Sequence, residues 1–215
     1  MSKTDCQNVT LSMIYPCYNE AEVIDQFYND LTTVLESLDG IAPEIIFVDD
    51  GSSDETLSRL NGLAKKDSRV LVCSLSRNFG HQIALTAGLD FASGDAAIMM
   101  DTDLQHPPEL IPEMIEKWRS GGDIVSAVRI DTEAVSWFKI LSSKTFYFVL
   151  NVFSRTQIPE GVADFTLLSR KVYLALRKMR ERHRFVRGMI CWMGFNRVFV
   201  EYRAQKRRIR LVCDQ

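Results

Sequence analysis

Short apolar segments alternate with longer amphipathic segments along the first 130 residues of the chain. The apolar segments predict β-strands at residues 9–15, 44–48, 70–75, 96–100 and 124–128. The amphipathic segments predict helices at residues 21–38, 54–66, 81–92 and 107–118. Strands that alternate with helices favour an α/β fold with a mostly parallel, doubly wound sheet. Ligands of such sheets bind beyond the carboxyl ends of the strands, so the residues after each strand are the candidates for function.

The pattern changes after residue 130. Residues 135–153 predict a helix rich in aromatic side chains, residues 171–179 predict another helix, and residues 197–202 predict a last strand. No uninterrupted apolar run reaches the roughly 18–20 residues of a membrane-spanning helix, so we expect none. Without an internal repeat or an obvious linker, the chain predicts a single domain with a basic, aromatic-rich C-terminal part.

Charge is distributed unevenly along the chain. Residues 1–134 carry 9 basic and 23 acidic side chains, whereas residues 135–215 carry 17 basic and 5 acidic ones. This asymmetry suggests that one part handles a cation and the other handles anions or a membrane surface, with chance clustering of solvated faces as the alternative. The five cysteines lack C-x-x-C spacing, and the N-terminus lacks the apolar run of a signal peptide. A reducing compartment therefore fits the chain best.

Acidic side chains follow two of the predicted strands. Asp101 and Asp103 lie two residues apart after the fourth strand, with the amide of Gln105 nearby. Oxygen ligands of this kind suit a hard divalent ion, Mg²⁺ or Mn²⁺, although both carboxylates could instead cap the next helix. Asp50 follows the second strand, where a carboxylate can accept a hydrogen bond from a ribose hydroxyl or a base N–H. The alternative is a turn that starts the following helix.

A third strand end offers Arg77, whose guanidinium suits a diphosphate. The chain has no G-x-G-x-x-G and no G-x-x-x-x-G-K-[ST] sequence, so neither the dinucleotide fingerprint nor a P-loop is present. These observations favour a nucleoside diphosphate that is held by a metal ion instead of a glycine-rich loop.

Four segments carry a family resemblance, in matching order and spacing: YPCYNE (15–20), VDDGSSD (48–54), RNFG (77–80) and MDTDLQHPPE (100–109). Together they resemble the family 2 glycosyltransferases of GT-A fold. The chain is most similar to the polyprenyl-phosphate group, which comprises bactoprenol glucosyltransferases and dolichol-phosphate mannose synthases. Segments ADF (163–165), LSR (168–170), RFVRG (184–188) and WMGF (192–195) extend the resemblance to about residue 207.

The resemblance implies a domain at residues 8–207, with a donor- and metal-binding half (8–130) and an acceptor-binding half (131–207), followed by an atypical tail (208–215). It implies transfer of a sugar from a nucleotide sugar of the UDP-glucose or GDP-mannose type to a polyprenyl phosphate, with inversion at the anomeric carbon. The implied donor-nucleotide residues are Pro16, Tyr18, Glu20, Asp50, Arg77 and Asp101. The implied metal ligands for Mg²⁺ or Mn²⁺ are Asp101, Asp103 and Gln105.

The implied catalytic residues are Asp164 and Asp103, and the implied acceptor-phosphate residues are Arg129, Lys139, Ser143 and Arg207. Because a lipid monophosphate is already largely dianionic at neutral pH, Asp164 is expected to orient groups instead of removing a proton. The expected location is the cytoplasmic face of the membrane, with the membrane surface as a partner, no nucleic acid, and a homo-oligomer left open.

The sequence departs from the family pattern at three points. Thr102 stands where the family usually has alanine, and His81 stands where many members have lysine. Family members also continue past the position of Arg207 with further segments, so a donor-binding remnant without turnover is an alternative. A second alternative is a phosphohydrolase with Asp101 as the nucleophile, although that chemistry is expected on a first strand.

Overall fold

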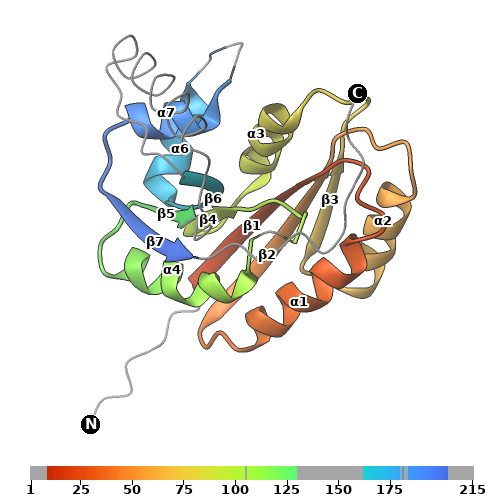
Figure 1. The fold of residues 1–215 in the computed structure, drawn as a ribbon, viewed down its shortest axis with the longest axis horizontal. Helices are drawn as coiled ribbons and strands as arrows, with labels where there is room; N and C mark the ends of the chain where they lie inside the picture. The colour runs from red at the N-terminus through yellow and green to blue at the C-terminus, as the bar shows by residue number, and fades with distance from the viewer. Residues whose placement is uncertain (1–8, 105, 130–161, 180, 182–183, 203–215) are drawn as a thin grey trace, which may run out of the picture.

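The computed structural model describes residues 9–104, 106–129, 162–179, 181 and 184–202, and these form a seven-stranded sheet with helices on both faces (Figure 1). The strands are β1 (Val9–Cys17), β2 (Ile41–Asp49), β3 (Val70–Ser74), β4 (Ala96–Met99), β5 (Ile124–Arg129), β6 (Val162–Ser169) and β7 (Arg197–Tyr202). The helices are α1 (Ile24–Glu36), α2 (Thr56–Lys66), α3 (His81–Phe91), the short 3₁₀ helix η1 (Pro108–Leu110), α4 (Ile111–Arg119), α6 (Arg170–Lys178) and α7 (Val186–Trp192).

The strand order is β3-β2-β1-β4-β6-β5-β7. All strands run in one direction except β6, which is antiparallel to its neighbours β4 and β5. The predicted α/β fold with a mostly parallel, doubly wound sheet is therefore confirmed. The sequence pattern did not predict β6, which separates β4 from β5 in the sheet.

Two apolar layers cover the sheet, because successive side chains of a strand point to opposite faces. Met13 and Tyr15 of β1 are buried in the layer beneath α1, α2 and α4. Ile14, which lies between them in the sequence, is buried in the layer beneath α3, α6 and α7. The nearly continuous apolar run of β2 follows from the same arrangement, since both faces of that strand are covered.

One edge of the sheet collects the carboxyl ends of six strands, because these strands run in parallel. The antiparallel strand β6 begins at this edge. In the antiparallel ladder of β4 and β6, Met99 pairs with Thr166. Asp101 lies two residues after Met99 and Asp164 lies two residues before Thr166, so these two residues are opposite each other. The fold thus joins a carboxylate from the later part of the chain to the carboxylates that follow β4.

Most predicted elements are observed with shifted bounds. The predicted helix at residues 21–38 is shorter, from Ile24 to Glu36, and the predicted helix at residues 107–118 begins with the 3₁₀ turn η1. Helix α7 was not predicted, and the helix predicted at residues 135–153 lies outside the described residues. Within the part of the chain that the structure describes, no helix has both the length and the apolarity needed to span a bilayer.

Candidate functional site

A cavity of about 420 Å³ opens at the carboxyl ends of β1, β2 and β4. Its wall comes from four separate loops and from the first residues of α3 and β6. Seven of the residues singled out from the sequence line it: Pro16, Tyr18, Glu20, Asp50, Asp101, Asp103 and Asp164. Side chains up to 148 residues apart in the sequence therefore share a single cavity. This agrees with the expectation that ligands of a parallel sheet bind beyond the carboxyl ends of its strands.

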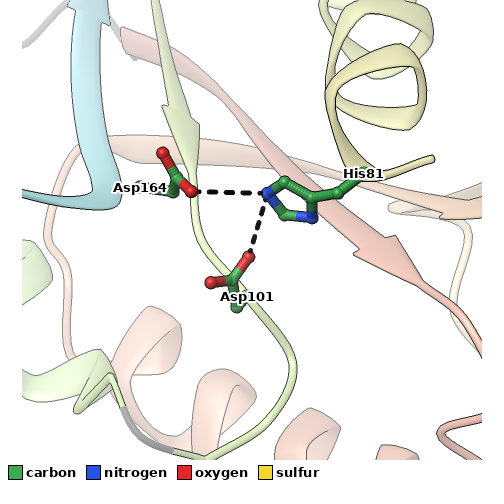
Figure 2. A group of neighbouring side chains, drawn as sticks. All are labelled: His81, Asp101 and Asp164. Atoms are coloured by element: carbon green, nitrogen blue, oxygen red, sulfur yellow. Dashed lines mark ion pairs between the residues drawn. The ribbon is translucent and has the colours of Figure 1, made fainter. Parts of the chain in front are cut away.

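Three side chains meet inside this cavity, as Figure 2 shows. His81 is the first residue of α3, and its Nε2 lies 3.5 Å from Oδ1 of Asp101 and 3.6 Å from Oδ2 of Asp164. A single nitrogen of the imidazole thus faces both a carboxylate that follows β4 and a carboxylate of β6 (Figure 2). The ligand atoms of these three side chains all lie within 4.8 Å of one another, a spacing that a single cation can span.

The electrostatics of the cavity favour a protonated His81. Burial alone would lower the pKa of His81, but the carboxylates of Asp164 and Asp101 beside the imidazole outweigh burial, so the pKa is raised. Burial likewise acts to raise the pKa of Asp164, but His81 and Arg187 outweigh it and hold the pKa of this carboxyl below its ordinary value. Asp164 is therefore a fixed negative charge at neutral pH.

Arg187 is the second cation beside Asp164. It lies on α7, its Nε donates a hydrogen bond of 3.1 Å to Oδ1 of Asp164, and its Nη2 lies 2.9 Å from the same oxygen. Arg187 belongs to the segment RFVRG (184–188), which carries part of the family resemblance, but no role was predicted for it. The contact joins residues 23 positions apart on elements that were not predicted, so local sequence patterns carried no signal for it.

Asp50 is nearly fully buried, and its carboxylate accepts two backbone hydrogen bonds. The N–H of Phe79 donates to one oxygen and the N–H of Gly80 donates to the other, each at 2.8 Å. Asp50 thus fixes the loop that leads into α3 and to His81. A carboxylate oxygen has two lone pairs, so each oxygen can still accept a further hydrogen bond from a ligand in the cavity.

Two more loops are held close to this one. Gly51 has a φ of +68°, and a Cβ at this position would lie 2.4 Å from the backbone carbon of Arg77, so only glycine fits between the loops after β2 and β3. Asn19 has a φ of 54°, a conformation that asparagine tolerates, and its Oδ1 accepts a 2.9 Å hydrogen bond from the N–H of Ser53. These contacts make the cavity wall a connected set of loops.

The remaining predicted site residues are distributed differently. Arg77 is exposed, its guanidinium lies 4.1 Å from the ring centroid of Phe79, and it does not line the cavity. Arg129 ends β5 at the same edge of the sheet and is exposed. The metal ligand predicted at Gln105 and the acceptor residues predicted at Lys139, Ser143 and Arg207 lie outside the described residues.

The donor set of the cavity fits a divalent cation. Asp101 and Asp103 both line it and offer carboxylate oxygens, which are the ligands that Mg²⁺ and Mn²⁺ prefer. Leu104, which follows Asp103, has a φ of 59° and packs its side chain against the apolar core. This left-handed turn ends the acidic loop and anchors it to the sheet.

Comparison with known proteins gives the family. The family model for glycosyl transferase family 2 matches residues 12–177, which include every cavity-lining residue named above. The chain belongs to glycosyl transferase family 2. An uncharacterized glycosyltransferase of Synechocystis sp. is 41% identical over 93% of this chain, and a prophage bactoprenol glucosyl transferase homolog of Escherichia coli K12 is 43% identical over 89%. The chain spans 62% of the length of each of these relatives.

Solved structures agree on the fold. A mannosyltransferase from Pyrobaculum calidifontis, solved with GDP-Man and Mn²⁺, matches 89% of this chain and 54% of its own, with a TM-score of 0.62 and 21% identity. Glucosyl-3-phosphoglycerate synthase from Mycobacterium tuberculosis, solved with Mn²⁺, UDP-glucose and phosphoglyceric acid, matches 94% of this chain and 73% of its own, with a TM-score of 0.59 and 18% identity. The expected GT-A fold of this family 2 member is confirmed.

Proposed function

We propose that this family 2 chain transfers a hexose from a nucleoside diphosphate sugar to a polyprenyl phosphate, with inversion, at the cytoplasmic face of a membrane. One observation carries the proposal: the carboxylates of Asp101, Asp103 and Asp164 line one cavity at the carboxyl ends of the parallel strands. Relatives with 43% identity are named bactoprenol glucosyl transferase, which supports the polyprenyl acceptor. Neighbours solved with GDP-Man or UDP-glucose support the donor class.

The donor diphosphate is proposed to bind with Mg²⁺ or Mn²⁺ on Asp101 and Asp103, with Gln105 as a further predicted ligand. When bound, the metal supplies positive charge that neutralises the departing nucleoside diphosphate. Pro16, Tyr18 and Glu20 line the part of the cavity that we assign to the nucleoside. Asp50 also lines the cavity, and its two backbone hydrogen bonds fix the loop before α3.

Asp164 is proposed to orient the reacting groups. A lipid monophosphate is largely dianionic at neutral pH and needs no base to become a nucleophile. Asp164 is ionised and lies against Arg187, so it can accept hydrogen bonds from sugar hydroxyls and hold this arginine near the acceptor phosphate. Positioning and charge compensation, instead of proton removal, are then the contributions of this pair.

The basic C-terminal part is proposed to receive the acceptor. Residues 135–215 carry 17 basic side chains against 5 acidic ones, which suits an anionic head group at an anionic membrane surface. Arg129, Lys139, Ser143 and Arg207 remain predictions for the acceptor phosphate. The division into a donor half at residues 8–130 and an acceptor half at residues 131–207 is part of the same proposal.

The experiment is transfer of radiolabelled sugar into a lipid-extractable product. The chain is incubated with UDP-glucose or GDP-mannose, undecaprenyl phosphate in detergent, and Mn²⁺ or EDTA. We expect a labelled lipid with at least one donor, its loss in EDTA, and its loss in Asp101→Asn. The matched control is Asp30→Asn, because Asp30 is an exposed carboxylate on α1 and does not line the cavity.

The outcomes separate this proposal from its alternatives. Metal-dependent nucleotide binding without lipid product would indicate a donor-binding remnant. Equal transfer by Asp101→Asn and the wild type would refute the assignment of the site. A phosphorylated Asp101 trapped from a phosphate ester would favour the phosphohydrolase.

A further inference from the structure

Helix α7 begins with a hydrogen bond to a side chain of another helix. Its first residue is Val186, whose backbone N–H donates a 2.8 Å hydrogen bond to Oε1 of Gln82. Gln82 is the second residue of α3, so the contact joins residues 104 positions apart. Because an N–H group can only donate, the amide atom of Gln82 that faces it is the oxygen.

The N-terminal end of α7 lacks a capping side chain of its own. The first N–H groups of a helix have no partner within the helix, and a polar N-cap side chain commonly accepts from one of them. The N-cap residue of α7 is Phe185, which makes no capping hydrogen bond. Val186 is only 2% exposed, and a buried N–H without an acceptor is costly. Gln82 therefore supplies from α3 the acceptor that an N-cap side chain supplies in other helices.

The residue that follows Val186 is Arg187, the cation that lies against Asp164. Its Nε donates a 3.1 Å hydrogen bond to Oδ1 of Asp164, and its Nη2 lies 2.9 Å from the same oxygen. The backbones of Val186 and Arg187 are consecutive, so a shift of the first turn of α7 would move the guanidinium relative to Asp164. The hydrogen bond from Gln82 thus fixes the turn from which Arg187 reaches this carboxylate.

The α3 end of the contact is connected to the loop beside Asp50. This loop leads into α3 and donates two backbone hydrogen bonds to the Asp50 carboxylate, each at 2.8 Å. Gln82 lies in the first turn of the same helix. One turn further along, Leu85 is buried in the same apolar layer as Val186, so α3 and α7 also pack against each other. A continuous series of contacts therefore joins the carboxylate that follows β2 to the carboxylate of β6.

We propose that Gln82 is a positioning residue that fixes Arg187 relative to the donor part of the cavity. Its amide oxygen caps α7, and through this helix it keeps the guanidinium of Arg187 against Asp164. The consequence for transfer rests on the proposed function, in which Arg187 lies near the acceptor phosphate and a metal ion holds the donor. Loss of the cap should therefore impair use of the acceptor and leave donor binding intact, because Asp50 still holds the loop before α3.

Two substitutions of Gln82 isolate the contribution of its amide oxygen. Gln82→Met keeps the length of the side chain and removes the acceptor. Gln82→Glu keeps an oxygen that accepts from the Val186 N–H, and a carboxylate is favourable at the N-terminal end of a helix. The matched control is Gln26→Met, because Gln26 is exposed on α1 and does not line the cavity.

The first measurement is hydrogen exchange by NMR in the ligand-free protein, which requires neither donor nor acceptor. We expect slow exchange of the Val186 amide in the wild type, in Gln82→Glu and in Gln26→Met. In Gln82→Met this amide should exchange at least about fivefold faster, because a buried donor loses its acceptor. The Nε–H of Arg187 should exchange faster as well. Equal exchange at either Val186 or Arg187 in the wild type and Gln82→Met would overturn the inference.

The second measurement separates acceptor use from donor binding. Calorimetry with Mn²⁺ and UDP or GDP should give Gln82→Met the same affinity as the wild type. A misplacement of about 1 Å can lower a rate about 100-fold, so transfer by Gln82→Met at limiting undecaprenyl phosphate should fall by up to about 100-fold. The KM for this lipid should rise, and Gln82→Glu should restore it. Equal losses of thermal stability, nucleotide affinity and transfer in Gln82→Met and Gln82→Glu would show a merely structural role and overturn the inference.

The failures of the two proposals are distinguishable. If the wild type forms the lipid product and Gln82→Met uses undecaprenyl phosphate equally well, the positioning role is wrong and the proposed function stands. If the wild type forms no lipid product with either donor, the proposed function fails, and hydrogen exchange at Val186 and Arg187 still decides whether Gln82 holds α7 in place.

Discussion

Helix α3 carries His81 into the cavity, and its distance from the sheet depends on Gly88. A Cβ at position 88 would lie 2.3 Å from Cγ2 of Ile14 and 3.1 Å from Cγ2 of Val48, both on the strands beneath the helix. Carbon atoms in contact are normally about 3.5–4.0 Å apart. Gly88→Ala therefore forces α3 or the side chain of Ile14 to move by more than about 1 Å.

Two opposing contributions determine the size of the effect. Alanine in place of glycine inside a helix stabilises the helix by about 1 kcal/mol. Overpacking of a filled core costs about 1–3 kcal/mol, and more where backbone must move. We expect Gly88→Ala to lower the free energy of unfolding by about 1–3 kcal/mol after the gain in helix propensity is included. In a protein of this size that corresponds to a fall in Tm of about 2–4 °C per kcal/mol.

The assay is urea unfolding followed by circular dichroism, with two companion variants. Gly62 also lies within a helix, α2, and a Cβ there would meet nothing within 4 Å, so Gly62→Ala should stabilise by up to about 1 kcal/mol. Ile14→Leu removes the Cγ2 methyl that opposes Gly88, because the branch of leucine lies one carbon further out. Adding Ile14→Leu to Gly88→Ala should therefore recover part of the loss.

Two results would refute this reasoning. The first is that Gly88→Ala is as stable as Gly62→Ala. The second is that Ile14→Leu and Gly88→Ala change the free energy of unfolding independently of each other. Because α3 begins with His81, the same shift should also weaken metal-dependent nucleotide binding by Gly88→Ala and leave Gly62→Ala unaffected.

Three further predictions follow from buried polar groups. Asp50→Asn should destabilise the fold by about 2 kcal/mol in urea unfolding, because an amide can accept only one of the two backbone N–H bonds that the carboxylate accepts; wild-type stability would contradict this role. The hydroxyl of Tyr15 is buried without a hydrogen-bond partner among the described residues, so Tyr15→Phe should leave stability unchanged or raise it by up to about 1 kcal/mol, and a clear loss would reveal a partner. The pKa of His81 is raised above about 6.5 by Asp164 and Asp101, which outweigh burial, so its contribution to stability is full below about pH 6.5 and is lost as the pH rises through the raised value. Unfolding in EDTA across this range should show that decline in the wild type and lack it in His81→Gln.

The sequence predicted the parallel part of the fold because burial on both faces leaves a local pattern. Strand β2 contains the run Ile45 to Val48 with every side chain fully buried, and such a run indicates a strand between two helical layers. Strand β6 left no such signal, since its place depends on antiparallel pairing with β4 and β5, far from it in the sequence. Helix α7 has only seven residues, too few for a clear periodic pattern.

The candidate site, like the fold, was predicted only in part from the sequence. Asp50, Asp101 and Asp103 were predicted correctly to line the site, because ligands bind at the carboxyl ends of parallel strands. Asp164 was predicted from the family resemblance and lines the same cavity. The contact that orients Asp164 comes from Arg187, which lies 23 positions further along the chain, and only the folded chain reveals which atoms face each other.

The most direct test of the proposed metal-dependent donor site is calorimetric titration with UDP and with GDP, in Mn²⁺ and in EDTA, for the wild type and Asp103→Ala. Asp103 lines the cavity and is a predicted metal ligand that makes no contribution to the sheet ladders. We predict that at least one nucleotide binds the wild type in Mn²⁺, and that EDTA or Asp103→Ala abolishes the binding. Equal affinity in EDTA, or in Asp103→Ala with Mn²⁺, would contradict a site in which carboxylates hold the donor diphosphate through a metal ion.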